Sequence, residues 1–128
     1  MKREIIFTTN APSAGFPYSQ AVKYGGLVFV SGQIAIDPVT GVLITGDMRA
    51  QTRRVLDNIQ AILQAAGTSL EWSVDSLCFL AKLRDFPEFN EIYRSYFSQN
   101  PPPRTTVQTG LPMDGLIEIR IIAGMPET

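Results

Sequence analysis

Residues 101–123 constrain the fold more than any other stretch, because a rigid extended entry leads into two alternating segments. Three consecutive prolines, residues 101–103, force an extended backbone and forbid a helix immediately before Arg104. Alternation with a period of two then predicts a strand with one face that carries Arg104, Thr106 and Gln108. The guanidinium of Arg104 is therefore expected at a well-fixed position at the start of a strand.

A second alternating segment follows and combines an apolar face with an acid. Ile117, Ile119 and Ile121 share one face of the predicted strand, whereas Glu118 points to the other face. A planar guanidinium at the start of a strand is suited to bind a small carboxylate through two parallel hydrogen bonds. Each charge-assisted bond contributes about 1.5–3 kcal/mol. Glu118 could hold a water molecule. The two charges also fit ordinary strand ends or a structural ion pair, and they do not by themselves decide between these alternatives.

Composition removes several kinds of chemistry. A chain of 128 residues is expected to form one domain over residues 1–128 and to bury a real core without disulfides. It has no histidine, the commonest general base and metal ligand, and its single cysteine excludes disulfides and zinc clusters. We therefore expect neither a metal nor a cofactor. The net charge of −1 shows no electrostatic footprint for a nucleic-acid backbone.

Membrane and export signals are not visible in the sequence. The N-terminal segment has one short apolar run, Ile5 to Phe7, which is far shorter than the core of a signal peptide. No apolar run approaches the length of a membrane span. We expect a soluble protein in a reducing compartment, by default the cytoplasm, with Cys78 as a buried thiol.

The first part of the chain predicts strands over residues 3–8, 19–23 and 27–31. A loop rich in proline and glycine separates the first two and carries Phe16 and Tyr18. The glycine pair at 25 and 26 predicts a hairpin turn between the second and third strands.

Two helices and one further strand are expected in the middle of the chain. Apolar residues recur at helical spacing over 49–66, with Asp47 as a plausible N-cap and Gly67 as the stop signal. The apolar run 72–83 predicts a central strand buried on both faces. A second helix over 85–97 has Asp85 and Glu88 in capping-box register. Its apolar stripe is expected in the core and consists of Phe89, Ile92, Tyr93, Tyr96 and Phe97.

The order of three strands, helix, strand, helix and two strands predicts an α+β fold. Strand–helix–strand connections of this length imply parallel strand pairs, with both helices on one face of the sheet. The other face would expose apolar side chains, for example those of Ile34, Ile36 and Val107. Such exposure favours a closed oligomer with sites between its subunits.

Several separated motifs resemble the Rid (YjgF) family, most closely its RidA group, in one register along nearly the whole chain. The matching segments are Asn10-Ala11-Pro12 with Pro17-Tyr18-Ser19-Gln20, Ser31-Gly32-Gln33-Ile34, Asp85-Phe86 with Asn90 and Tyr93, and Pro103-Arg104 with Leu111-Pro112 and Ile117-Glu118-Ile119. The first helix also matches, over residues 57–63 and 65–67. Each motif is weak alone, but their order and spacing are specific.

The resemblance implies a chorismate-mutase-like fold, β-β-β-α-β-α-β-β, and a homotrimer with clefts between subunits. It also implies cofactor-free hydrolysis of 2-imino or 2-enamino acids, such as 2-iminobutanoate and 2-iminopropanoate, to 2-keto acids and ammonia. Matched by position, Arg104 is expected to grip the substrate carboxylate and Glu118 to position or activate the attacking water. The remaining expected cleft residues are Tyr18, Ser31, Gly32, Asn90 and Thr106.

Three positions depart from the family pattern and put substrate preference in question. Phe16 stands where the family usually has glycine, Thr106 where close relatives have cysteine, and Arg120 where a second acid is usual. Two alternative functions also remain. One is an endoribonuclease or translation inhibitor, for which Arg49, Arg53 and Arg54 form the single basic cluster. The other is a non-catalytic sensor or holdase that binds small carboxylates.

Overall fold

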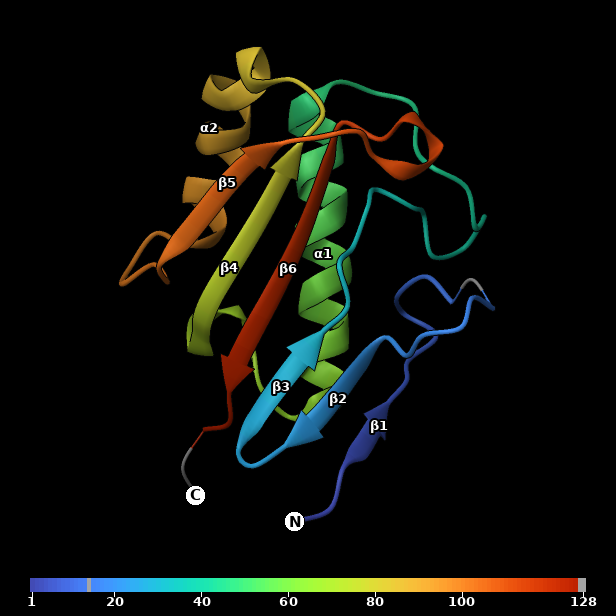
Figure 1. Ribbon diagram of the computed structural model, residues 1–128, viewed down its shortest axis with the longest axis vertical. Helices are drawn as coiled ribbons and strands as arrows, with labels where there is room; N and C mark the ends of the chain where they lie inside the picture. The colour runs from blue at the N-terminus through green and yellow to red at the C-terminus, as the bar shows by residue number, and fades with distance from the viewer. Residues whose placement is uncertain (14, 127–128) are drawn as a thin grey trace.

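Six strands form one mixed sheet, and two helices pack behind it in the view of Figure 1. The computed structural model describes residues 1–13 and 15–126. The elements in chain order are β1 (Glu4–Ile6), β2 (Ala21–Tyr24), β3 (Leu27–Val30), α1 (Met48–Ala66), β4 (Ser73–Leu80), α2 (Phe86–Tyr96), β5 (Arg104–Gln108) and β6 (Ile117–Gly124). The expected α+β class and the expected order of elements are confirmed.

The spatial order of the strands is β1-β2-β3-β6-β4-β5. β4 and β5 pair in parallel through α2, as a strand–helix–strand unit predicts. β3 and β4 also run parallel to each other, but they are not neighbours because β6 lies between them and pairs antiparallel with both. The expected direct pairing across α1 was therefore wrong, since the last strand of the chain occupies the centre of the sheet.

Local signals define the first hairpin and the first helix. Gly25 and Gly26 form the two-residue turn between β2 and β3 with φ angles of 62° and 80°, which glycine adopts without steric cost. The Asp47 carboxylate caps α1 by accepting a hydrogen bond of 3.0 Å from the backbone N–H of Ala50. Gly67 ends α1 in the left-handed conformation, with its N–H directed at the carbonyls of Leu63 and Gln64.

The start of α2 differs from the expected capping box. A single 3₁₀ turn, Leu83–Asp85, precedes the helix, and Asp85 makes no side-chain capping bond. Asp85 has φ −87° and ψ 6°, which is not the extended conformation that directs an N-cap oxygen back at the first turn. The reciprocal bond is also missing, because a buried Glu88 carboxylate oxygen has no hydrogen-bond partner among the described residues.

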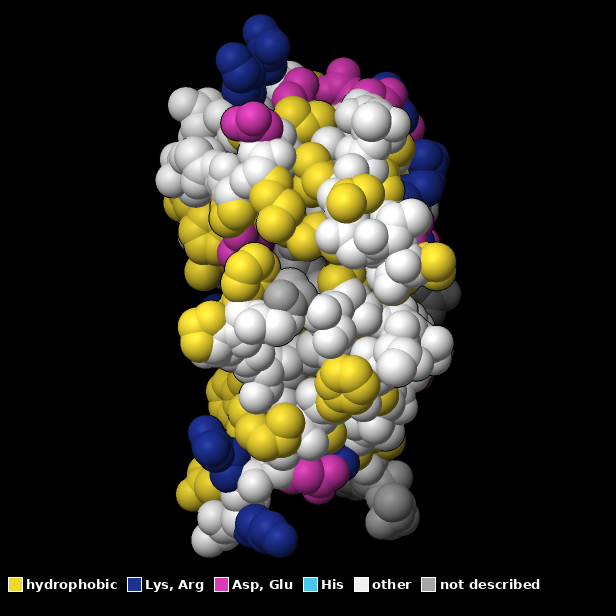
Figure 2. Space-filling view, turned by 90° about the vertical axis from the view of Figure 1, so that its right-hand side faces the viewer, with side chains coloured by type: hydrophobic (Ala, Val, Ile, Leu, Met, Phe, Trp, Pro, Cys, Tyr) yellow, Lys and Arg dark blue, Asp and Glu magenta, His cyan; other side chains and the backbone are white. Residues whose placement is uncertain are grey.

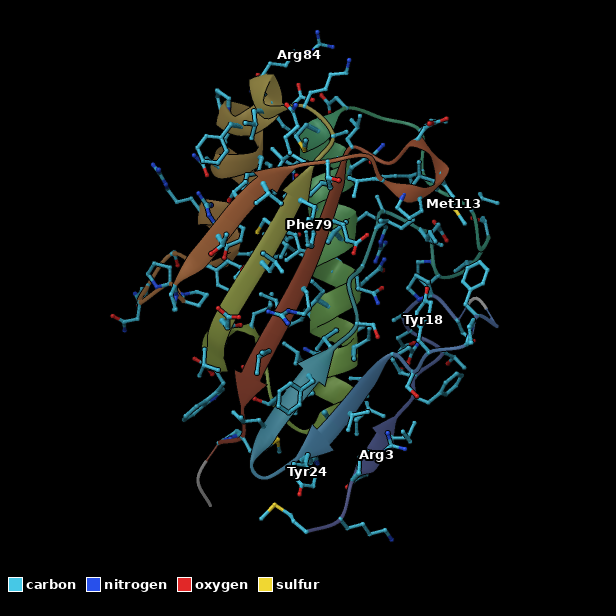
Figure 3. The ribbon with its side chains drawn as sticks, viewed as in Figure 1. Arg3, Tyr18, Tyr24, Phe79, Arg84 and Met113 are labelled. Carbon is cyan, nitrogen blue, oxygen red and sulfur yellow. The ribbon has the colours of Figure 1, made fainter. Side chains whose placement is uncertain are left out.

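The expectation that β4 is buried on both faces was wrong. Ser76, Cys78 and Leu80 are buried beneath the helices, whereas Leu77 and Phe79, on the alternate face, are only partly buried. Both helices cover the same side of the sheet, and no helix in the described part of the chain covers the other side, called the open face below. Phe79 stands on this open face, toward the viewer in Figure 3. The open face also exposes Ile5, Phe29 and Val107.

Ile36 was expected to be exposed but is buried, at 8% exposure. It forms an isolated antiparallel bridge with Leu43, so the intervening turn brings these two backbone segments side by side. No helix among the described residues has the length and apolarity needed to cross a lipid bilayer.

Candidate active site

Arg104 begins β5 and lies on a bed of aromatic rings from α2. Its guanidinium carbon is 5.4 Å from the ring centre of Phe86, 5.1 Å from that of Phe89 and 4.8 Å from that of Tyr93. These distances are typical of cation–π contacts. The ion pairs among the described residues, Arg49–Glu91 and Arg120–Asp75, leave Arg104 without an acidic partner. The guanidinium is thus held by ring faces, while its charge is not neutralised by a carboxylate of this chain.

The aromatic rings that contact Arg104 are anchored to strand β4 by a hydrogen bond. The Tyr93 hydroxyl donates a 2.9 Å hydrogen bond to the Ser76 hydroxyl, which lies 3.5 Å from the Cys78 sulfur. Cys78 is fully buried, as expected, and burial raises the pKa of its thiol to about 11. The aromatic stripe is therefore part of the core, as expected, and it also supports Arg104, which its periodicity did not reveal.

Two of the other expected site residues lie on the same side as Arg104. Thr106 follows Arg104 by two residues and therefore shares its face of β5. Asn90 lies four residues after Phe86 and three before Tyr93, which places it on the helix face that carries those rings. The structure thus brings Arg104, Asn90 and Thr106 to one region, which we call the arginine half-site.

Glu118 lies on β6 and points away from the helices. Its neighbours Ile117 and Ile119 are fully buried under α1, so alternation directs Glu118 to the open face. Partial burial raises the pKa of its carboxyl above the usual range of a glutamate. The carboxyl therefore holds its proton more readily than an ordinary surface glutamate.

Gly32 is the residue that makes room for Glu118. A methyl group placed on Gly32 would overlap the Glu118 carboxylate, since its carbon would lie 3.0 Å from Cδ and 3.3 Å from Cγ of Glu118. The residues that follow Gly32 and Glu118 fix this close approach, because Gln33 and Ile119 exchange two backbone hydrogen bonds of 2.9 and 3.1 Å. Gly32 is thus needed for close approach.

Tyr18 and Ser31 lie on the same side as Glu118. Tyr18 is 60% exposed and stacks on Phe16, with ring centres 6.0 Å apart. The Ser31 hydroxyl donates a 2.6 Å hydrogen bond to the carbonyl of Ser19, so it ties the end of β3 to the Tyr18 loop. Tyr18, Gly32 and Glu118 line a hollow of about 550 Å³ in the face shown in Figure 2. Together with Ser31 they form what we call the glutamate half-site.

Gln20 is a supporting residue that the motif contained but that we did not predict as part of the site. Its side chain is buried, accepts a 2.8 Å hydrogen bond from the N–H of Thr8 and donates to the carbonyls of Thr8 and Pro12 at 3.0 and 2.9 Å. These bonds fasten the segment before the Tyr18 loop to β2. A buried glutamine at a strand start was the available signal, because such a side chain needs several partners.

The two half-sites do not meet within one chain. Arg104 pairs in register with Ser76 of β4, and Glu118 pairs with Phe79. Ser76 and Phe79 are an odd number of residues apart, so the two charged side chains project from opposite faces of the sheet. They are also two strands apart, about 10 Å at the usual strand spacing. An Arg104–Glu118 ion pair, one of the alternatives from the sequence, is not formed.

Arg120 does not pair with Glu118 either. Its guanidinium forms a 2.9 Å ion pair with Asp75 on the neighbouring strand β4. The charge introduced at this departure from the family pattern is thus balanced locally and leaves Glu118 free.

The fold and the two half-sites define a chorismate-mutase-like α+β protein with a free arginine and a partly buried acid. The sequence profile described as Endoribonuclease L-PSP matches residues 8–125. The chain belongs to this family, which is also called the YjgF or Rid family.

Individual relatives agree with this assignment. A RutC family protein from Pyrococcus horikoshii is 49% identical over 122 residues, which cover 94% of this chain and 97% of the relative. Reactive Intermediate Deaminase A, chloroplastic, from Arabidopsis thaliana is 42% identical over 124 residues, which cover 96% of this chain and 66% of the relative. The crystal structure of E. coli TdcF with bound serine has a TM-score of 0.91 at 39% identity, covering 96% of this chain and 99% of TdcF.

The raised pKa of Glu118 predicts a pH-dependent cost in stability. Below the pKa of an unfolded glutamate, about 4.3, the carboxyl is protonated in both states and costs nothing. As the pH rises through that value toward the higher folded-state pKa, the unfolded state is favoured, because it ionises first. Glu118→Gln should therefore gain more stability over the original chain at pH 7.5 than at pH 4.5. Urea unfolding at both pH values and one protein concentration measures the difference, and an equal gain at both would contradict it.

Proposed function

We propose that this protein is a cofactor-independent hydrolytic deaminase of 2-imino and 2-enamino acids that produces 2-keto acids and ammonia. The observation that carries the proposal is Arg104, whose charge has no acidic partner in the described chain and whose guanidinium is fixed on three rings. A small α-carboxylate is the partner that such a fork suits best. The name of the Arabidopsis relative and the serine bound to TdcF support this class of ligand.

The chemistry requires little beyond positioning and proton transfer. A protonated imine is already electrophilic at carbon, so Arg104 would orient it through the carboxylate while Glu118 takes a proton from a water molecule. The water oxygen bonds to the carbon and gives a carbinolamine. Glu118 would return the proton to the nitrogen, and the carbon–nitrogen bond would break to release ammonia. The hydroxyl oxygen would then form the carbonyl by giving its remaining proton to Glu118, which passes it to the ammonia. A carboxyl with a raised pKa is suited to these transfers, because it exchanges protons closer to neutral pH.

The site we propose lies between two copies of the chain. Arg104 and Glu118 project from opposite faces of the sheet, so one small substrate cannot contact both within a chain. A heterologous contact that closes into a ring would place the arginine half-site of one copy against the glutamate half-site of the next. The exposed apolar side chains of Ile5, Phe29 and Val107 on the open face favour its burial against another copy of the chain. We propose a cytoplasmic homotrimer, the assembly implied by the family resemblance.

The basic cluster offers little support for an endoribonuclease. Arg49 is paired with Glu91 at 2.8 Å, and Arg54 donates a 3.1 Å hydrogen bond to Asn58 on its own helix. Two of the three cations are thus occupied, and no aromatic platform for stacked bases accompanies them in the described part of α1.

Arg104→Ala should lower the turnover of 2-iminobutanoate by about 10²-fold or more, because a key positioning group is lost. A threonine dehydratase generates the imine in place, and keto-acid release is timed with semicarbazide as a competing trap. Arg84→Ala, which removes an exposed arginine outside both half-sites, is the matched control. Near-original turnover in a folded Arg104→Ala protein would refute the role of the arginine. No acceleration by the original protein, despite keto-acid binding, would support the sensor alternative.

Mixed oligomers test whether the site is shared between chains. Arg104→Ala and Glu118→Gln are each expected to be nearly inactive, but coexpression should restore about a quarter of the original activity, because half of the arginines and half of the glutamates combine at random. That quarter applies to the unfractionated mixture. Chains with different affinity tags allow the mixed trimers to be purified, and these should show about a third of the original activity, because each holds one intact site of three. If the mixture is as inactive as either parent, both residues serve one chain or the proposed assembly is wrong.

Gly32→Ala should reduce turnover by at least about tenfold with little change in stability, because the added methyl displaces a flexible carboxylate and not the backbone. Gly32 does not have a positive φ, so alanine is not strained there. Gly110→Ala is the control, since nothing lies within 4 Å of its added methyl group. Turnover and urea unfolding are measured together, and equal turnover in both variants would argue against this role of Gly32.

A further inference from the structure

The hollow beside Glu118 has more room than the smallest imino acids need. Its volume of about 550 Å³ lies within the range of small-molecule sites. It is bounded by residues 5–7, by the Tyr18 loop, by residues 32–36 and by the 3₁₀ turn Pro112–Asp114. Figure 2 shows hydrophobic side chains gathered on this face of the molecule.

The walls of this hollow are mostly apolar and carry one charge. Glu118 is the single charged side chain among the described residues that line it. The large apolar side chains of the wall are Ile5, Ile6, Phe7, Phe16, Ile34, Ile36 and Met113. Such a wall favours an uncharged hydrocarbon group and disfavours a charged or strongly hydrated one.

Phe16 and Met113 lie on two different segments of the rim. Phe16 is 50% exposed and stacks on Tyr18, and Met113 is 52% exposed. Figure 3 shows Tyr18 and Met113 on the same side of the molecule, from the two loops that bound the hollow. Met113 and Asp114 both have left-handed φ angles, 58° and 57°, which side chains rarely adopt. Strain of this kind is often found at functional sites.

The turn that carries Met113 is held by a tight contact. A methyl group added to Gly115 would lie 3.3 Å from the carbonyl oxygen of Pro112 and 3.7 Å from the Leu43 side chain. Gly115 is buried, so the turn packs closely on the neighbouring loop. The backbone that carries Met113 is thus held against the neighbouring loop.

We propose that the hollow is a side-chain subsite that makes the enzyme prefer imino acids with apolar side chains of about four carbons, with Phe16 and Met113 as specificity-determining residues. The inference rests on the proposed function. The reacting carbon must lie beside Glu118, and its carboxylate points toward Arg104 of the adjacent copy, so the remaining substituent faces the hollow. A methyl group would leave most of the apolar wall in water, whereas a branched chain would cover it.

The test compares two imines formed by an L-amino-acid oxidase, with catalase present, from leucine and from alanine. We expect kcat/KM to favour the leucine-derived imine by about tenfold or more. Met113→Glu should reduce that ratio at least about fivefold, because the glutamate places a charge in the wall. The new side chain inherits the same backbone conformation, so no extra strain is introduced. Val39→Glu is the matched control, because Val39 is 91% exposed and outside the hollow, and should leave the ratio unchanged.

A ratio near one in the original protein, or a ratio unaffected by Met113→Glu, would overturn the subsite. Binding separates this failure from failure of the proposed function. Calorimetry with 4-methyl-2-oxopentanoate and 2-oxopropanoate needs no turnover, and tighter binding of the larger acid that Met113→Glu abolishes would support the subsite even in an inactive protein. Equal binding of the two acids would overturn it. Phe16→Ser should shift both the kinetic and the binding ratio in the same direction as Met113→Glu.

Discussion

The alternation of β6 is the constraint on which the other features of the site depend. β6 lies between β3 and β4, and its isoleucines bury one face of the strand beneath the helices. Glu118 must then point to the open face, and the bridge between Gln33 and Ile119 places Gly32 beside it. A slip of one residue would bury the glutamate and expose the isoleucines, a cost that the apolar core does not allow. The position of the acid is therefore determined by hydrophobic burial.

Arg104 illustrates a different way of holding a charge. An acidic partner would fix the guanidinium but would also compete with any carboxylate ligand. Aromatic faces attract the cation through their quadrupoles and leave its N–H edge available. The bed of Phe86, Phe89 and Tyr93 is anchored by the bond from Tyr93 to Ser76, so the arginine is ordered before a ligand arrives. Such preorganisation lowers the entropy lost on binding.

Local signals allowed much of the fold to be predicted from the sequence. The hairpin glycines and the caps Asp47 and Gly67 act through their own backbone, so their effects were correctly expected. The burial of β4 was not, because a run of apolar residues cannot indicate which faces of a sheet the rest of the chain covers. The sequence also could not predict that Arg104 and Glu118 lie on opposite faces of the sheet, because their relative position depends on the register of three strands. The resemblance to known proteins supplied candidate site residues that periodicity and charge alone could not separate from ordinary strand ends.

The burial of Cys78 has a consequence for durability. The imines that we propose as substrates are electrophiles, and a thiolate is the side chain most readily modified by electrophiles. With a pKa of about 11, only about one thiol in ten thousand is ionised at neutral pH, and the sulfur is enclosed beneath Arg104 and α2. The chain contains no other cysteine. A protein built in this way could work among reactive compounds without being alkylated by them.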